Sequence, residues 1–276
     1  MRVSISNIAW ETSHDEQVCD ILQRHGVDAI DIAPGKYFSD FAEASLEQIA
    51  KVRSWWSERG IEIIGMQSLL YGKEGLNLFS KSDIQQRMLD HLQEVCRIGD
   101  GLNARRLVFG SPRNRDRSGL SDEQAFEKAI LFFRRLAEVA QRYGVTICLE
   151  PNPECYGSNF MTSSTKTAAV VEAVAHPAIR MQFDTGALSI NGENPSTICS
   201  EFQCLIGHVH ASEPQLVPVG TGETDHPASA AALKEFLPNA PVTIEMLTNS
   251  SDAPMAAVEA SVEYVVACYG SSAREL

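Results

Sequence analysis

The sequence predicts an α/β fold in which eight parallel strands, each followed by a helix, close into a barrel that forms a single domain over residues 1–276. Short apolar runs alternate with longer stretches of helical period along the whole chain, as in proteins with a parallel sheet. Eight strand–helix units fit this length, with no linker or low-complexity segment between them. The alternative, an open doubly wound sheet, is disfavoured because the turn after the first strand lacks a glycine-rich phosphate loop.

The expected strands are short apolar runs that end at a proline, a glycine or a polar residue. They cover residues 3–8, 29–33, 61–67, 106–110, 145–150, 179–184, 206–210 and 242–245. The expected helices lie between these runs and after the last one, at residues 15–25, 45–59, 82–99, 121–143, 165–175, 195–203, 228–236 and 254–269. Gly26 and Gly60 stop the first two helices, and Ser121 with Gln124 predicts a capping box for the fourth.

Composition and charge exclude several classes of function. The net charge of −13 opposes a surface for the phosphate backbone of nucleic acids. No apolar run approaches the roughly 20 residues of a membrane span, and the N-terminus lacks the features of a secretory signal, so we expect a cytoplasmic protein. The seven cysteines form no Cys-x-x-Cys pair, which argues against both disulfides and a thiolate zinc site.

Four of the expected strands end with a residue that can bind a metal. In residues 145–150 the side chains alternate, so that Val145, Ile147 and Leu149 lie on one face and Glu150 ends the more polar face. The same pattern recurs in three later strands and places candidate ligands at their ends: Asp184, His210 and Glu245. Because strand ends converge at one mouth of such a barrel, we expect these four residues to meet there.

Three carboxylates in one cavity repel each other unless a cation neutralises them. Three oxygen ligands and one imidazole, with open positions, suit one divalent ion, and Mn²⁺, Mg²⁺ or Co²⁺ fit best. Zinc remains an alternative. The alternative is that each is an ordinary polar residue at a strand end. It is less favoured because all four residues lie on the more polar face of their strands.

Other polar residues near the expected mouth have two interpretations each. Arg113 and Arg115 could bind an anionic group of a substrate, or belong to a solvated loop that contacts a second subunit, which leaves a homo-oligomer open. Trp10 could wall the pocket or pack in the core. Asn152 is a candidate for binding substrate hydroxyls. His208 lies two residues below His210, about 6.5–7 Å away by strand rise, and is expected behind the ligands or in interior packing.

These strand-end residues carry a resemblance to the sugar (phosphate) isomerase/epimerase branch of the xylose-isomerase-like TIM-barrel superfamily, and the chain resembles the ketose 3-epimerases of that branch. The resemblance covers nearly the whole chain. It implies that the two glutamates, Glu150 and Glu245, serve as acid and base as well as metal ligands. Glu213 matches the His-x-x-Glu of that branch, and Gly220-Thr-Gly222 resembles its Pro-Gly-x-Gly turn.

Two positions depart from the ketose 3-epimerases. Ala187 and Leu216 stand where that group has a histidine and an arginine that contact the substrate. His226 could supply a replacement polar group from the same loop, next to Asp225, which we expect to cap the following helix.

The expected function is therefore that of a metal-dependent isomerase or epimerase of a sugar, sugar phosphate or polyol derivative, acting through a metal-stabilised cis-enediolate. A dehydratase of a keto-polyol is the alternative on the same site, and a non-catalytic sugar-binding homologue is a second. An endonuclease of abasic sites, known in the same superfamily, is disfavoured because too few histidines lie near the mouth. The expected partner is a small sugar-like substrate.

Overall fold

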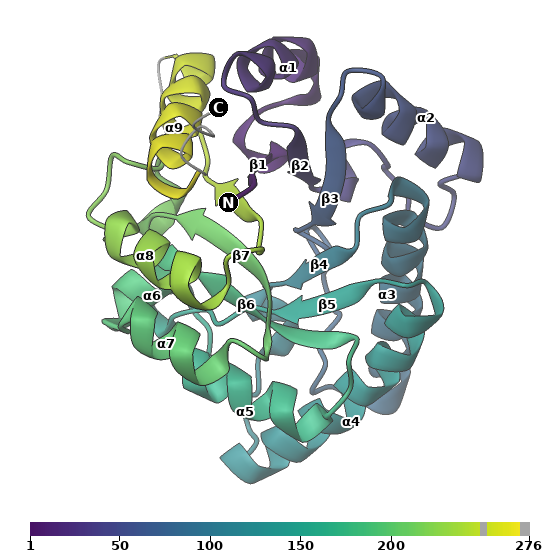
Figure 1. The fold of residues 1–276 in the computed structure, drawn as a ribbon. Helices are drawn as coiled ribbons and strands as arrows, with labels where there is room; N and C mark the ends of the chain where they lie inside the picture. Colours follow the sequence, from purple (N-terminus) through teal and green to yellow (C-terminus); the bar gives the residue numbers. More distant parts are fainter. Residues whose placement is uncertain (249–252, 271–276) are drawn as a thin grey trace.

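A closed barrel of eight parallel strands forms the centre of the molecule, as the computed structural model shows (Figure 1). The structure describes residues 1–248 and 253–270. The strands follow one another around the barrel in chain order, and β1 pairs with β8 to close it. The strands are β1 (Val3–Ser6), β2 (Ala29–Ile32), β3 (Glu62–Met66), β4 (Arg106–Phe109), β5 (Thr146–Leu149), β6 (Ile179–Asp184), β7 (Ile206–Ser212) and β8 (Val242–Glu245). The predicted fold class is confirmed.

Helices surround the barrel and cover the outer faces of the strands (Figure 1). In the described residues they are α1 (Asp15–Arg24), α2 (Leu46–Ser57), α3 (Ser82–Leu102), α4 (Asp122–Arg142), α5 (Ser164–Val174), α6 (Thr185–Asn191), α7 (Pro195–Phe202), α8 (His226–Phe236) and α9 (Pro254–Tyr269). Short 3-10 helices occur in the connecting loops, at Asn7–Ala9, Thr12–His14, Pro34–Lys36, Pro112–Arg115, Glu154–Tyr156 and Pro214–Leu216.

Local sequence signals set most helix limits where they were predicted. Ser121 Oγ accepts a hydrogen bond from Gln124 N, and the Gln124 side chain accepts one from Ser121 N, which completes the predicted capping box. The end predicted for the third helix was wrong. Gly99 lies inside α3, where an added Cβ would meet Leu107 at 3.1 Å, and the helix ends instead at Asn103, in a left-handed conformation.

Helix α6 was not predicted. It begins directly after β6, and Asp184 caps it by accepting a hydrogen bond of 2.6 Å from Ala187 N. The sequence analysis placed no helix between residues 184 and 195, because it assigned Asp184 to metal binding alone. Aspartate is also a strong N-cap residue. One side chain therefore ends a strand and begins a helix.

The barrel interior is polar, whereas the space between strands and helices is apolar. Five fully buried polar side chains lie inside the barrel, below its mouth: Ser4, Asp31, Gln182, His208 and Thr243. Ser4 Oγ and Thr243 Oγ1 lie 2.6 Å apart across the β1–β8 seam. His208 is therefore directed into the barrel interior, as expected.

Membrane-spanning helices and disulfides were both expected to be absent. Across residues 1–248 and 253–270, no helix combines the length and apolar character needed to cross a bilayer. The seven cysteines all lie in the described part of the chain, and each is a free thiol.

Candidate metal centre and active site

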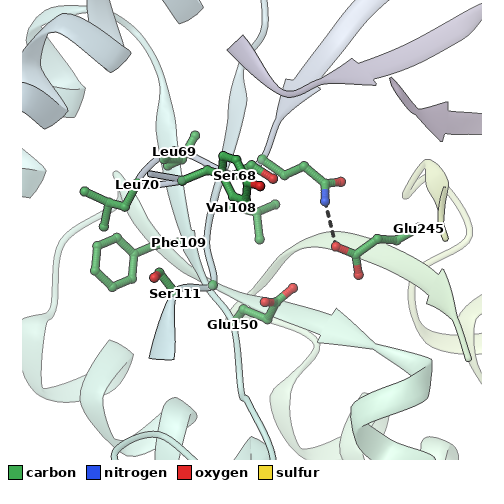
Figure 2. Close-up of a pocket in the computed structure, with 11 residues that line it drawn as sticks. Ser68, Leu69, Leu70, Val108, Phe109, Ser111, Glu150 and Glu245 are labelled. Carbon is green, nitrogen blue, oxygen red and sulfur yellow. Dashed lines mark hydrogen bonds between the residues drawn. The ribbon is translucent and has the colours of Figure 1, made fainter. Parts of the chain in front are cut away.

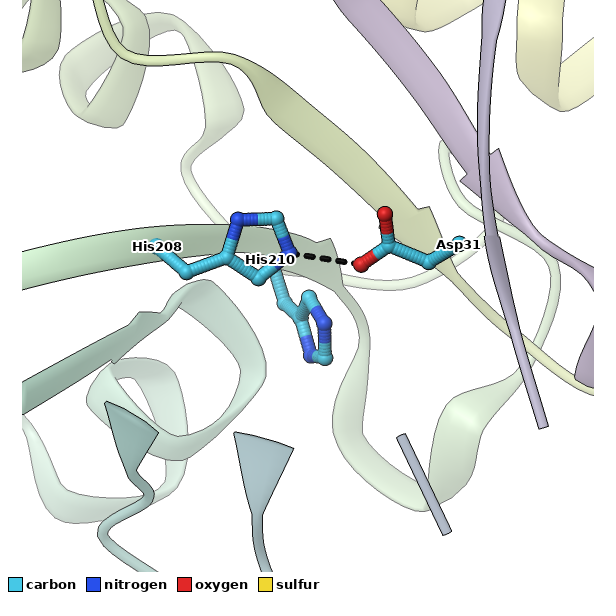
Figure 3. Close-up of side chains that lie close together, drawn as sticks. All are labelled: Asp31, His208 and His210. Carbon is cyan, nitrogen blue, oxygen red and sulfur yellow. Dashed lines mark hydrogen bonds and ion pairs between the residues drawn. The ribbon is translucent and has the colours of Figure 1, made fainter. Parts of the chain in front are cut away.

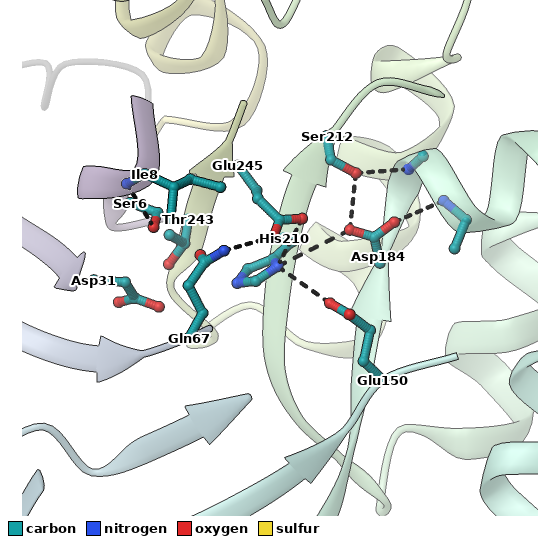
Figure 4. A network of polar contacts seen from close by, with 12 residues as sticks. Ser6, Ile8, Asp31, Gln67, Glu150, Asp184, His210, Ser212, Thr243 and Glu245 are labelled. Carbon is teal, nitrogen blue, oxygen red and sulfur yellow. Dashed lines mark hydrogen bonds and ion pairs between the residues drawn. The ribbon is translucent and has the colours of Figure 1, made fainter. Parts of the chain in front are cut away.

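The four candidate ligands meet at the mouth of the barrel (Figure 4). Glu150 follows the last residue of β5, Asp184 and Glu245 end β6 and β8, and His210 lies within β7. His210 is fully buried, and the carboxylate side chains are only 9–13% exposed. The sequence therefore brings one imidazole and three carboxylates from four neighbouring strands into one enclosed space.

The distances between these side chains fit a single shared ion. His210 Nδ1 lies 3.3 Å from Glu245 Oε2, 3.6 Å from Glu150 Oε1 and 4.0 Å from Asp184 Oδ2. One ligand atom from each residue lies within 4.8 Å of the other three. Ligands held about 2.1 Å from one ion are about 3–4.2 Å apart, so the spacing suits a divalent metal.

Buried polar atoms without hydrogen bonds give a second indication of a cation site. His210 Nε2 has no hydrogen-bond partner, and Glu150 Oε1 and His210 Nδ1 have none besides the ion-pair contacts between the candidate ligands themselves. Such atoms are rare in native proteins, because burying a polar group without a partner costs free energy. The four side chains therefore fit a metal in their geometry, and a bound ion would also supply a partner for their buried polar atoms.

The electrostatics of the cluster point the same way. Burial and the neighbouring carboxylates of Glu245 and Glu150 together raise the pKa of Asp184 to about 7. Burial alone would lower the pKa of His210, but the same two glutamates outweigh it and hold that pKa well above its usual value. The protein alone thus leaves an excess of negative charge that protons balance in part.

Each carboxylate is oriented by hydrogen bonds from its neighbours. Asn152 Nδ2 donates to Glu150 Oε2 at 3.0 Å. Gln67 Nε2 donates to Glu245 Oε1 at 2.6 Å. Ser212 Oγ donates to Asp184 Oδ2 at 2.8 Å, as Figure 4 shows. These bonds leave at least one oxygen of each glutamate, Oε1 of Glu150 and Oε2 of Glu245, directed at His210.

A buried acid–imidazole pair lies directly below His210 (Figure 3). His208 Nε2 and Asp31 Oδ2 are 2.6 Å apart, and both side chains are fully buried. The rings of His208 and His210 meet edge to face with centroids 5.3 Å apart. The position of His208 behind the ligands agrees with the sequence analysis, whereas the partner, Asp31, was not foreseen.

Two cavities lie beside the carboxylates of the candidate ligands. One is lined by Gln67, Ser68, Phe109, Ser111 and the two glutamates (Figure 2). A second, of about 330 Å³, lies over Glu150, Asp184 and Glu245 and is also lined by Asn152, Ala187 and Leu216. Both glutamates line both cavities, so a small polar molecule can reach them together.

The loop arginines occupy different environments. Arg113 is exposed, whereas Arg115 is fully buried. Arg115 Nη1 donates to the Glu150 carbonyl oxygen at 2.7 Å, and Nη2 donates to Asn152 Oδ1. Its guanidinium is thus used to fix the loop that carries Glu150 and Asn152, and the expectation of a paired anion site with Arg113 does not describe this geometry.

Glu213, His226 and Trp10 also contact the protein itself. Glu213 accepts hydrogen bonds from Gly220 N and Thr224 N, and lies 3.2 Å from His226 Nε2. His226 is fully buried and does not line the cavities, although it was expected to replace a substrate contact. Trp10 is buried and donates its indole N–H to Asp15, which supports core packing over a pocket wall.

Sequence reasoning missed three residues of the site. Gln67 directly follows β3, as Glu150 directly follows β5, and strand-end logic could have found it. Ser212 lies two residues after His210 on the same strand face, so parity also gave its direction. Asp31 is the one acid in an otherwise apolar strand, β2, which is an unusual place for an unpaired charge.

Comparison with known proteins assigns the family. The model of the xylose isomerase-like TIM barrel family matches residues 19–268. The chain therefore belongs to the xylose isomerase-like TIM barrel family.

Proteins similar in sequence or in fold include sugar epimerases and a probable dehydratase. The L-ribulose 3-epimerase of Methylomonas sp. (strain DH-1) is 28% identical over 123 residues, which are 44% of this chain and 42% of that protein. The match thus spans less than half the length of the relative. The D-psicose 3-epimerase of Clostridium cellulolyticum H10, solved with D-tagatose, superposes with a TM-score of 0.81 at 17% identity over 98% of this chain and 100% of that one. A probable 3-DHS dehydratase from Bacillus anthracis gives 0.72 at 12% identity over 96% and 99%. At these identities the two structures support the shared fold.

Proposed function

We propose that the chain is a divalent-metal-dependent epimerase or isomerase of a sugar derivative. The observation that carries the proposal is the pair of glutamates, Glu150 and Glu245, that approach His210 Nδ1 from different strands at 3.6 and 3.3 Å and face the same cavities. The partial match to an L-ribulose 3-epimerase supports the same reaction class.

Four residues would hold the metal: Glu150, Asp184, His210 and Glu245. We propose Mn²⁺, because three carboxylates and one imidazole suit a fairly hard ion of flexible coordination. When bound, the ion would polarise a carbonyl and an adjacent hydroxyl of the substrate. The seven free cysteines suit a reducing compartment, and on that ground we place the protein in the cytoplasm.

The two glutamates supply the acid–base chemistry. One glutamate, as the carboxylate, removes the proton from the carbon beside the carbonyl, and the other, as the carboxylic acid, returns a proton to the opposite face of the planar enediolate. Hydrogen bonds from Asn152 to Glu150 and from Gln67 to Glu245 orient the two side chains. Asn152 also lines the cavity, and we assign it to the substrate hydroxyls.

Solvent exchange tests the proposal. Manganese-loaded protein in D₂O should introduce deuterium at the reacting carbon of its substrate, as NMR would show for a panel of ketoses, sugar phosphates and keto-inositols. Glu150→Gln and Glu245→Gln should each abolish net conversion, and one of them should still exchange the proton of one epimer. Glu154→Gln, an exposed carboxylate in the same loop as Asn152, is the matched control and should keep full activity. Product without deuterium would replace the two-base mechanism with a hydride shift or a shielded transfer.

A dehydratase is the second candidate. The same proton removal can be followed by loss of a β-hydroxyl, and the fold is shared with a probable 3-DHS dehydratase. The apolar side chains of Ala187 and Leu216 line the cavity near Asp184 and do not offer hydrogen bonds to a substrate there. A product lighter than its substrate by one water, rather than of equal mass, would select this candidate.

A further inference from the structure

A larger cavity adjoins the metal centre on the side of strands β1, β2 and β3. Its volume is about 750 Å³, against about 330 Å³ for the cavity over Glu150 and Asp184. Glu245 and Leu216 line both cavities. A molecule that reacts at the glutamates can therefore extend past Leu216 into the larger space.

The smaller cavity is already large enough for a single sugar. Pockets for small molecules begin at about 300 Å³, and the two spaces together exceed the need of one six-carbon ring several times. Leu216 is fixed at their boundary, because its carbonyl oxygen accepts a hydrogen bond of 2.8 Å from Leu247 N. The backbone at the boundary is thus held in place, and the side chain of Leu216 is apolar and adds no charge beside Glu245.

The walls of the larger cavity combine aromatic rings with polar groups. Phe38, Phe41 and Tyr71 line it, and Tyr71 is 88% exposed although it also borders the cavity of Figure 2. Two lysines line it: the ammonium group of Lys36 is paired with Glu11 at 3.3 Å, and that of Lys73 lies over the ring of Phe41, 5.5 Å from its centroid, so at most one cation is free of a carboxylate. A sugar ring has an apolar C–H face for aromatic side chains and a polar rim for charged ones. A phosphate would instead need several uncompensated cations or a helix N-terminus.

We propose that the physiological substrate is a neutral keto sugar that carries a second sugar unit, with the reacting unit at the glutamates and the second unit in the larger cavity against Tyr71. This inference rests on the proposed function, because it takes the reacting unit to be a keto sugar. It excludes free ketohexoses and sugar phosphates as the preferred substrates.

A series of three ketoses that differ at one position tests the substrate class. D-Fructose, D-fructose 6-phosphate and isomaltulose carry a hydroxyl, a phosphate and a glucosyl group on carbon 6, and lactulose moves the second sugar to carbon 4. Deuterium uptake at the reacting carbon by the manganese-loaded protein gives kcat/KM for each. We expect one of the two disaccharides to exceed fructose and fructose 6-phosphate by about tenfold or more. A preference for either monosaccharide would overturn the proposal.

Variants at Tyr71 locate the second sugar. Tyr71→Ala should lower kcat/KM for the preferred disaccharide about tenfold more than kcat/KM for fructose, through a higher KM for the disaccharide. Tyr71→Phe retains the ring and should keep most of the preference. Leu131→Ala removes an exposed apolar side chain of α4, away from the cavity, and is the control for stability. Equal losses on all substrates would overturn the placement.

Binding separates this inference from the proposed function. Calorimetry of isomaltulose and lactulose with manganese-loaded protein gives a dissociation constant whether or not turnover occurs. Disaccharide binding that Tyr71→Ala weakens, without deuterium exchange on any substrate, would refute the epimerase and retain the subsite. Exchange on fructose with no disaccharide preference, or no disaccharide binding, would retain the epimerase and refute the subsite.

Discussion

Gly110 lies beside the candidate metal centre, and replacing it with alanine should disturb that site without harming the fold. A Cβ at position 110 would lie 2.0 Å from Glu150 Oε2 and 2.9 Å from the carboxyl carbon. Non-bonded carbon and oxygen need about 3.3 Å or more, so the carboxylate must retreat by about 1 Å. The backbone of Gly110 does not require glycine, since its φ is not positive. The clash therefore falls on the end of a flexible side chain.

The expected magnitudes follow from this displacement. A shift of about 1 Å in a catalytic group can cost about 100-fold in rate, and a misdirected ligand about 10- to 100-fold in metal affinity. The alanine itself restricts the unfolded chain, so the free energy of unfolding of the metal-free protein should change by less than about 1 kcal/mol. Calorimetric titration with Mn²⁺, deuterium exchange and urea unfolding measure the three quantities. Gly35→Ala, where no atom lies within 4 Å of the added Cβ, is the control. A Gly110→Ala variant with the wild-type dissociation constant for Mn²⁺ would refute the reasoning.

Three further predictions concern residues that act through others. Asp31→Asn removes the carboxylate that orients His208 beneath the candidate ligand His210, so calorimetry should show about tenfold weaker Mn²⁺ binding. Ser4→Ala, in the same buried layer, should bind Mn²⁺ as tightly as the wild type. Burial raises the pKa of Glu213, but donors from His226, Thr224 and Gly220 outweigh it and lower the pKa to about 2. Its charged form therefore contributes stability above the unfolded pKa that is lost as pH falls, so the advantage over Glu213→Gln in urea unfolding should shrink by about 3 kcal/mol from pH 5 to pH 2. Arg115→Met leaves two buried acceptors unpaired and should lower the free energy of unfolding by about 2–5 kcal/mol. Arg113→Met, at an exposed position, should leave the urea unfolding midpoint unchanged. Equal midpoints for the two variants would contradict the placement of Arg115.

The order and limits of the strands could be predicted because the two-residue period of a strand and the 3.6-residue period of a helix are both visible in short stretches of sequence. β6 and β8 begin and end at the predicted residues, and the capping box at Ser121 needs only four consecutive residues. The four candidate ligands could be found for the same reason, since parity along one strand gives the direction of its last side chain. Their meeting point follows from closure of the barrel.

The contacts behind the site could not be predicted from periodicity. Asp31 meets His208 from a strand 177 positions away in the chain, and no local pattern specifies that pairing. The direction of Arg115 was also out of reach, because charge clustering in a loop says nothing about whether a guanidinium turns outward or into the protein. His226 was assigned to the mouth from its loop, but the helix cap at Asp225 turns it inward against Tyr269.

The carboxylate of Glu213 joins the two ends of a short loop, because it accepts a hydrogen bond from Gly220 N. Gly220 has a φ of +90°, which other residues adopt only with strain. The segment between these two points, residues 214–219, includes Leu216 at the cavity boundary. Both ends of the segment are thus fixed independently of what lies between them. Substitutions within it can alter which molecules enter the cavities without moving His210 or the other candidate ligands, so the preference for a substrate can change while the candidate metal centre keeps its geometry.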